Sequence, residues 1–148
     1  MTKETAPQKF RIERQIRAPR ELAWEALLDV LSAAGYAVEG DPPPHGRGSR
    51  IAFRIGDYDL VEETLSFEPP SLRRYALVAG APLDTYEATI AIEDDGEGCR
   101  LEWSYVADPG AHPDAAIFLG QARQALTFAA DHIVATAEGR HASSLAPG

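Results

Sequence analysis

The chain has 148 residues, a hydrophobic share of 45%, a charged share of 25% and a net charge of −9 at pH 7. These values are typical of one folded domain with its own core, and the negative charge disfavours nucleic acid or an anionic membrane surface as a partner. The single cysteine, Cys99, excludes an internal disulfide and multi-cysteine metal motifs. No apolar run reaches the roughly 20 residues of a membrane span, and the polar start does not resemble a secretory signal, so we expect a cytoplasmic protein.

The first part of the chain predicts a strand followed by two short helices. Residues 1–8 are polar and contain a proline, so we expect them to be disordered. Apolar and polar residues alternate over 9–17, as in a half-buried strand, although Arg14 falls on the apolar face. Proline suits the first turn of a helix, which predicts a helix over 19–30. One further helical turn over 31–34 ends at a glycine, a residue that often caps helices.

The middle of the chain predicts an antiparallel sheet. Residues 36–39 predict a short strand, and the proline- and glycine-rich segment 41–49 predicts a loop. The strand patterns that follow are separated by short turns, whereas parallel neighbours need crossover connections of roughly a dozen residues or more. Together with 9–17 and 36–39, the strands that complete a seven-stranded sheet are expected at 51–55, 58–67, 73–78, 85–92 and 99–106.

The stretch 113–138 predicts a long helix that covers one face of this sheet. It has no internal proline after its first residue and consists mostly of good helix formers. Its apolar stripe carries large residues at both ends, Phe118 and Ile133, and alanines in the centre. Small side chains fill a core poorly, so we expect a cavity between the helix and the sheet. Residues 139–148 form a polar tail that we expect to be disordered, which leaves 9–138 as the single domain.

Several short motifs add a resemblance to this pattern. They are Ile16-Arg17-Ala18-Pro19 followed by Leu22-Ala23-Trp24, Phe67-Glu68-Pro69-Pro70 with Arg73-Arg74-Tyr75, Gly80-Ala81-Pro82 with Tyr86, and the strand Gly98-Cys99-Arg100-Leu101-Glu102-Trp103. With these motifs, the chain resembles the START-like superfamily, also called SRPBCC, over most of its length. Within that superfamily it is most similar to bacterial polyketide cyclase/dehydrase-like and lipid-transport-like proteins.

The resemblance implies an α+β helix-grip fold, in which a curved seven-stranded antiparallel sheet wraps around a long C-terminal helix. It also implies a deep pocket between the concave face of the sheet and that helix. Because the superfamily includes carriers, cyclases, hydrolases and ligand sensors, the resemblance specifies the fold much better than the function.

The alternation along the strands indicates which side chains face this pocket. The inner face combines aliphatic residues with tyrosine and tryptophan, which offer flat apolar area and a polar tip. These aromatic residues could equally fill a solid core, and the alanines of the helix are the reason for expecting space. The candidate ligand-binding residues on the apolar phase are Phe53, Tyr75, Leu77, Tyr86, Ile90, Trp103, Tyr105, Ala122, Ala125 and Ala129.

Two charged residues, Arg14 and Glu63, also fall on the inner phase and complete the candidate binding site. A buried unpaired charge is costly, so we expect them either to pair with each other or to hold a polar group of the ligand. Alternatively, a bulge in the strand 58–67 would turn Glu63 outward beside Glu62. No pair of histidines has a metal-binding spacing, and we expect neither a metal nor another cofactor.

Two functions are compatible with such a pocket. The first is binding of a small hydrophobic ligand, such as a lipid, polyketide, isoprenoid or aromatic compound, by a monomer or homodimer. The second is an enzyme of the polyketide cyclase/aromatase or dehydratase kind, in which an inner group such as Glu63 or Tyr75 transfers protons. No catalytic residue follows from the sequence. A third hypothesis, a protein–protein role for the outer sheet face, has no apolar patch in the sequence to support it.

Overall fold

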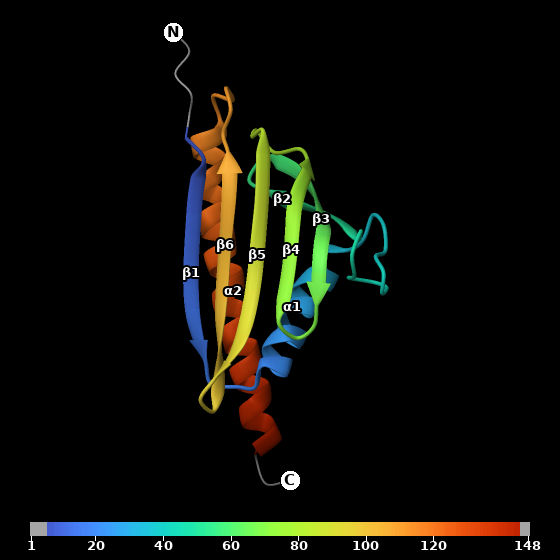
Figure 1. Ribbon diagram of the computed structural model, residues 1–148, viewed down its shortest axis with the longest axis vertical. Coiled ribbons are helices and arrows are strands. Elements are labelled where there is room, and N and C mark those ends of the chain that lie inside the picture. The colour runs from blue at the N-terminus through green and yellow to red at the C-terminus, as the bar shows by residue number, and fades with distance from the viewer. Residues whose placement is uncertain (1–5, 146–148) are drawn as a thin grey trace.

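Six strands and two helices make up the computed structural model, which describes residues 6–145. The strands form one antiparallel sheet in the order β1-β6-β5-β4-β3-β2, and both helices pack on the same face of it (Figure 1). The elements in chain order are β1 (Gln8–Ile16), α1 (Arg20–Ala34), β2 (Arg50–Ile55), β3 (Tyr58–Glu68), β4 (Leu72–Ala79), β5 (Thr85–Asp95), β6 (Gly98–Asp108) and α2 (Ala115–Leu145).

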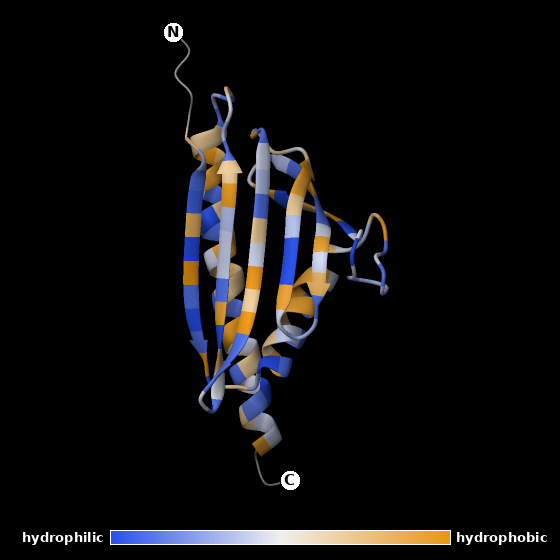
Figure 2. Cartoon of the chain, in the orientation of Figure 1, coloured by the Kyte–Doolittle hydropathy of each residue, from blue (hydrophilic) through white to orange (hydrophobic). Residues whose placement is uncertain are grey.

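The arrangement is a helix-grip-like α+β fold. Strands β2 to β6 follow one another through short turns, and β1 returns to pair with β6 along its whole length. Helix α2 lies behind β1 and β6 in Figure 1, and α1 lies beside it. Hydrophobic and hydrophilic residues alternate along the strands (Figure 2), which gives the sheet one apolar face for the helices to cover.

The predicted inner face is confirmed for strands β5 and β6. Alternate side chains of both strands are buried, as period-two geometry requires when one face of a sheet packs on a core. The buried residues are Tyr86, Ala88, Ile90 and Ile92 of β5, and Cys99, Leu101, Trp103, Tyr105 and Ala107 of β6.

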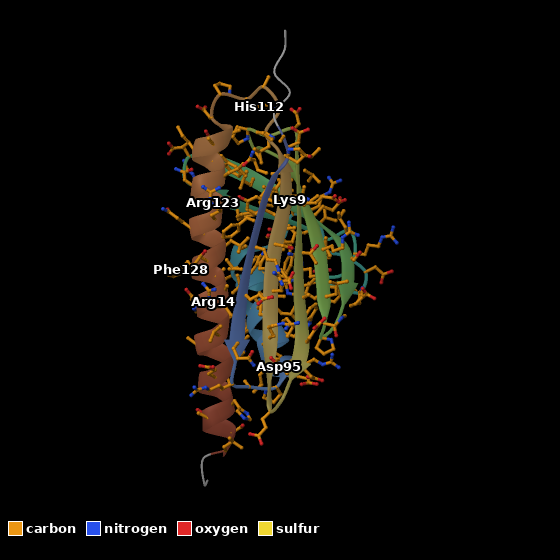
Figure 3. The ribbon with its side chains drawn as sticks, turned by 60° about the vertical axis from the view of Figure 1, so that its left-hand side comes forward. Lys9, Arg14, Asp95, His112, Arg123 and Phe128 are labelled. Atoms are coloured by element: carbon orange, nitrogen blue, oxygen red, sulfur yellow. The ribbon has the colours of Figure 1, made fainter. Side chains whose placement is uncertain are left out.

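The buried face of α2 is displaced from the predicted stripe by part of a turn. Ala122 is buried as expected, but the centre of the face is formed by Leu126 and Ala130, while Ala129 is half-buried and Ala125 is exposed. Phe128 is 77% exposed and lies on the side of α2 that faces away from the sheet (Figure 3). Neither of the two described helices is long and apolar enough to cross a membrane.

Two of the predicted elements are wrong within the described chain. The strand expected at 36–39 is reduced to one bridge, Val38 to Arg50, because the prolines that follow Gly40 lack the N–H groups that would extend the ladder. The sheet therefore has six strands and not seven. The two short helices expected at 19–30 and 31–34 are one continuous helix, α1. It has no break near residue 30 and ends before Gly35, whose positive φ of 86° suits the end of a helix.

The predicted chain ends also need correction. Of the segment 1–8, residues 1–5 lie outside the described residues, and Gln8 is already the first residue of β1. Helix α2 begins at Ala115, after the predicted start at Pro113, and continues to Leu145 through most of the tail that was expected to be disordered. An ion pair between Arg140 and Asp29 of α1 holds this extension. The last three residues, 146–148, lie outside the described residues.

Candidate ligand-binding site

A cavity of about 200 Å³ lies between the inner face of the sheet, the end of α1 and the middle of α2. Its walls are mostly aromatic and aliphatic, and α2 contributes alanines. Arg54 on β2 and Ala125 on α2 line the cavity and are both exposed, so it reaches solvent between these two elements. Ala122 and Leu126 line it and are buried, which places them deeper than this opening.

Most of the predicted binding residues line this one cavity. They are Phe53, Tyr75, Leu77, Tyr86, Trp103, Ala122, Ala125 and Ala129. Ile90 and Tyr105 are buried in the adjoining core and do not line it. That any of these residues binds a ligand stays a prediction.

The polar part of the cavity wall is a buried ion pair between Glu62 of β3 and Arg73 of β4. Arg73 Nη2 lies 2.6 Å from Glu62 Oε2, and the two side chains are 1% and 9% exposed, respectively. Arg73 Nη2 also donates a hydrogen bond to Thr64 Oγ1 (3.0 Å). The guanidinium carbon lies 4.7 Å from the centroid of the Tyr75 ring, within the range of a cation–π contact.

Two polar atoms of this ion pair have unused hydrogen-bonding capacity. Arg73 Nε is buried and has no hydrogen-bond partner among the described residues. Glu62 Oε2 is close to Arg73 Nη2, but the contact lacks the geometry of a hydrogen bond, so the oxygen is held by charge and not by an aligned N–H. Buried polar atoms usually find partners, and both residues line the cavity.

Burial shifts the pKa values of the ionisable side chains in the cavity wall. It raises the pKa of Glu62, although the nearby positive charge of Arg73 acts in the opposite direction. Burial likewise raises the pKa of Tyr75 above the ordinary range of a phenol, so its hydroxyl stays neutral and accepts a hydrogen bond from Trp103 Nε1 (3.1 Å). Glu62 is therefore better suited than Tyr75 to exchange a proton near neutral pH.

Glu63 and Arg14 do not complete the cavity wall, and for Glu63 the alternative of a bulge that turns it outward is confirmed, although Glu62 lies inside. Glu63 is on the outer side of β3, where its Oε1 accepts a hydrogen bond from Arg50 Nε at 2.8 Å. Arg14 does lie on the side of β1 that faces α2 (Figure 3), but its Nε pairs with Asp131 at 2.7 Å. Neither residue lines the cavity, and the two do not pair with each other.

The error comes from one of two irregularities in the pairing of β3 with β4. Register shifts occur between Val61 and Glu62, where the extra residue is Val78 of β4, and between Thr64 and Ser66, where it is Leu65 of β3. The extra residue in β3 puts the inner side chains before it out of phase with Phe67 after it. Phe67 packs against the core, and the inner side chains before it are Leu60, Glu62 and Thr64, and not Glu63.

The sequence did contain a signal for Arg73. It lies two residues before Tyr75 on a strand whose alternation had already placed Tyr75 and Leu77 inside. The same phase puts Arg73 on the inner face, where it is 1% exposed. An arginine in the cavity in turn calls for a buried carboxylate nearby, and this requirement favours Glu62 over a residue on the outer face.

A second polar cluster lies at the loop 40–49 and is centred on a buried histidine, which contacts two exposed side chains. His45 is 5% exposed, and its Nε2 lies 2.6 Å from the Tyr36 hydroxyl and 3.1 Å from Ser32 Oγ. Burial, and then the positive charge of Arg73, lower the pKa of His45. No group of His, Cys, Asp and Glu residues in 6–145 is arranged to hold a metal ion.

His45 is expected to make folding sensitive to mild acid. Its folded pKa is below the unfolded value of 6.5, so the unfolded state takes up the proton first and stability falls as pH decreases below about 6.5. The slope from this one group is at most about 1.4 kcal/mol per pH unit. Urea unfolding between pH 5 and 7.5 should show a smaller slope for His45→Gln than for the wild type. Equal slopes would mean that His45 is already solvated in the folded protein.

Residues 7–138 match the family model described as polyketide cyclase / dehydrase and lipid transport. The match covers nearly all of the described chain and confirms the resemblance found in the sequence motifs. No curated protein matches the sequence.

Solved structures share the fold at low sequence identity. Ara h 8.0201 superimposes with a TM-score of 0.67 at 15% identity, over 93% of this chain and 99% of its own. The Zhui aromatase/cyclase from Streptomyces sp. R1128 has a TM-score of 0.66 at 16% identity, over 91% and 96%. The di-domain ARO/CYC StfQ from the steffimycin biosynthetic pathway has a TM-score of 0.69 at 15% identity, over 90% of this chain and 52% of its own.

Proposed function

Because the chain belongs to the polyketide cyclase/dehydrase and lipid-transport family, we propose that it binds a small, mostly apolar molecule in the cavity between the sheet and α2. The observation that carries this proposal is a cavity of about 200 Å³ with aromatic walls and an opening to solvent. Burial of apolar ligand surface, at about 25 cal/mol per Å², supplies most of the affinity. Trp103, Tyr75 and Tyr86 provide flat contact area, and the Glu62–Arg73 pair orients the polar end of the ligand.

One observation also favours a second function, an enzyme of the cyclase/aromatase or dehydratase kind. Glu62 lines the cavity, and burial raises its pKa, so its carboxyl group is more easily protonated than an exposed one and is a candidate general acid or base. Arg73 would then stabilise negative charge that develops on a bound carbonyl or enol. This assigns to Glu62 the role that the sequence reading had given to Glu63.

Two measurements test the binding proposal. In a Trp24→Phe variant, Trp103 is the remaining tryptophan; it lines the cavity, whereas Trp24 packs against Phe67 (ring centroids 5.4 Å apart). Small aromatic compounds such as indole and naphthalene should shift or quench its emission and raise the melting temperature, because a ligand held only by the folded state stabilises it. Native mass spectrometry of protein purified from its own host should show a co-purified small molecule. The proposal fails if no compound changes either signal and nothing co-purifies.

Turnover separates the two functions. A binding protein returns the ligand unchanged after extraction, whereas an enzyme converts a candidate substrate, and Glu62→Gln abolishes that conversion while binding persists. Conversion that survives in Glu62→Gln would exclude Glu62 as the proton-transfer group.

A further inference from the structure

The polar wall of the cavity carries both signs of charge in one place. Glu62 and Arg73 form an ion pair with no net charge, and both side chains are at least nine-tenths buried. Other groups close to them, Thr64 and Tyr75, are neutral, and burial keeps the Tyr75 phenol protonated. A ligand that enters the cavity therefore meets a neutral but strongly polar site.

Within this site, one donor and one acceptor are incompletely used. The donor is Arg73 Nε–H, which has no partner among the described residues, and the acceptor is Glu62 Oε2, which lacks a well-aligned hydrogen bond. A ligand hydroxyl can serve both at once, because its oxygen accepts one hydrogen bond while its hydrogen is donated in another. Without a ligand, these two buried atoms have lost their hydrogen bonds to water and have gained none in return, which costs free energy. A ligand hydroxyl that bonds to both atoms removes this cost.

The size of the cavity limits the rest of the ligand. At about 200 Å³ it is smaller than the roughly 300–1,000 Å³ of sites for drug-sized molecules and larger than the roughly 150 Å³ cavity that holds benzene. One ring or two fused rings fit this space, and a long acyl chain does not.

We propose that the ligand is an uncharged hydroxylated aromatic molecule of one or two fused rings, whose hydroxyl group binds between Glu62 and Arg73. This inference rests on the proposed binding function and narrows its ligand class. The hydroxyl donates to Glu62 Oε2 and accepts from Arg73 Nε, and the rings lie against the aromatic wall formed by Tyr75, Tyr86 and Trp103. Arg54 lines the exposed opening, where its Nε donates a hydrogen bond to Gly56 O and lies 3.9 Å from Asp59.

Charged ligands of the same shape fit the site less well. A carboxylate that approaches Arg73 also meets the negative charge of Glu62 only a few ångströms away, and like charges in a desolvated site repel strongly. Such a ligand binds only if Glu62 takes up a proton. A ligand with an ammonium group is repelled in the same way by the positive charge of Arg73. The ion pair thus selects for neutral molecules.

A matched set of three naphthalene compounds tests this selection. Naphthalene, 2-naphthol and 2-naphthoate share one ring system and differ at pH 7 only in their polar group. Isothermal titration of the full-length protein should give a Kd for 2-naphthol at least about tenfold lower than for naphthalene, because the hydroxyl gains hydrogen bonds to charged partners. The Kd for 2-naphthoate should be higher than that for 2-naphthol.

The possible outcomes separate this inference from the proposed function. Tighter binding of 2-naphthoate than of 2-naphthol would overturn the inference and indicate an anion site. Equal affinities for the three compounds would overturn it too, while leaving an apolar binding function in place. If none of the three binds, and the indole and extraction experiments are also negative, the binding function itself fails.

Variants of the ion pair test the mechanism. Glu62→Gln removes the negative charge, and the preference should then reverse so that 2-naphthoate binds more tightly than 2-naphthol. Should this variant not fold, the double variant Glu62→Leu with Arg73→Met removes both charges and should bind naphthalene and 2-naphthol with Kd values within about threefold of each other.

Glu63→Gln, on the outer face of the same strand, is the matched control and should leave the order of the three Kd values unchanged. A double variant that keeps the full preference for 2-naphthol would overturn the proposed hydroxyl site.

Discussion

Replacing Arg73 with methionine is expected to lower the free energy of unfolding by about 3–5 kcal/mol, because the Glu62 carboxylate then stays buried without its partner. The variant also loses the hydrogen bond to Thr64 and the contact with the Tyr75 ring. Urea or guanidinium unfolding at pH 7 measures the change. The loss should become smaller as pH falls, because a buried carboxyl group whose pKa is raised takes up a proton more readily and then no longer carries the unpaired charge.

Two further variants show whether the effect belongs to the buried pair. The double variant Glu62→Leu with Arg73→Met should recover most of the stability, since apolar residues of similar size often replace a buried ion pair at little cost. Arg50→Met breaks the exposed pair with Glu63 on the opposite face of β3, and it should cost no more than about 1 kcal/mol. If Arg73→Met costs as little as Arg50→Met, the pair is not desolvated in solution.

The inner and outer faces could be predicted from the sequence for those strands in which buried and exposed residues alternate without interruption. Strands β5 and β6 pair in register over their full lengths, so each side chain from Thr85 to Asp95 keeps the face that alternation assigns to it. Tyr86 and Trp103 were therefore placed in the cavity wall from their phase alone. The packing of the long helix on this face could also be predicted, because an apolar sheet face has to be covered and the stretch 113–138 was the longest helix available to cover it.

Strand β3 shows where that reasoning stops. Its bulge at Leu65 is set by how it pairs with β4, and pairing between strands is not visible in the local sequence. A glutamate occurs at two successive positions, so the hydrophobic pattern does not say which of Glu62 and Glu63 is inside. Only the partners decide: Arg73 is on the inner face and Arg50 on the outer one.

The burial of His45 and the helical end of α2 were not predicted, for a related reason. Both depend on contacts between segments that are distant in the chain or lack a regular period. His45 lies in a loop rich in proline and glycine, yet it is buried because Ser32 and Tyr36 bind its ring. The polar tail is helical because Arg140 reaches Asp29 of α1, and composition alone does not predict that ion pair.

The second large effect is expected from Ala125→Trp, which should raise the Kd of a bound naphthalene compound at least about hundredfold, or about 2.8 kcal/mol. Ala125 lines the cavity and is exposed, so a larger side chain can enter the cavity or cover its opening without displacing buried neighbours. We therefore expect the free energy of unfolding to change by less than about 1 kcal/mol. Calorimetric titration and urea unfolding of the same preparation measure both quantities.

Ala135→Trp is the matched control, because Ala135 is an exposed alanine of the same helix that does not line the cavity. It should leave both affinity and stability close to those of the wild type. Tight binding that persists in Ala125→Trp would mean that the ligand enters elsewhere than between β2 and α2. A loss of more than about 2 kcal/mol in stability would indicate overpacking, which costs about 1–3 kcal/mol in a filled core. In that case the alanines of α2 serve close packing against β2, and the space that the binding proposal requires is absent in solution.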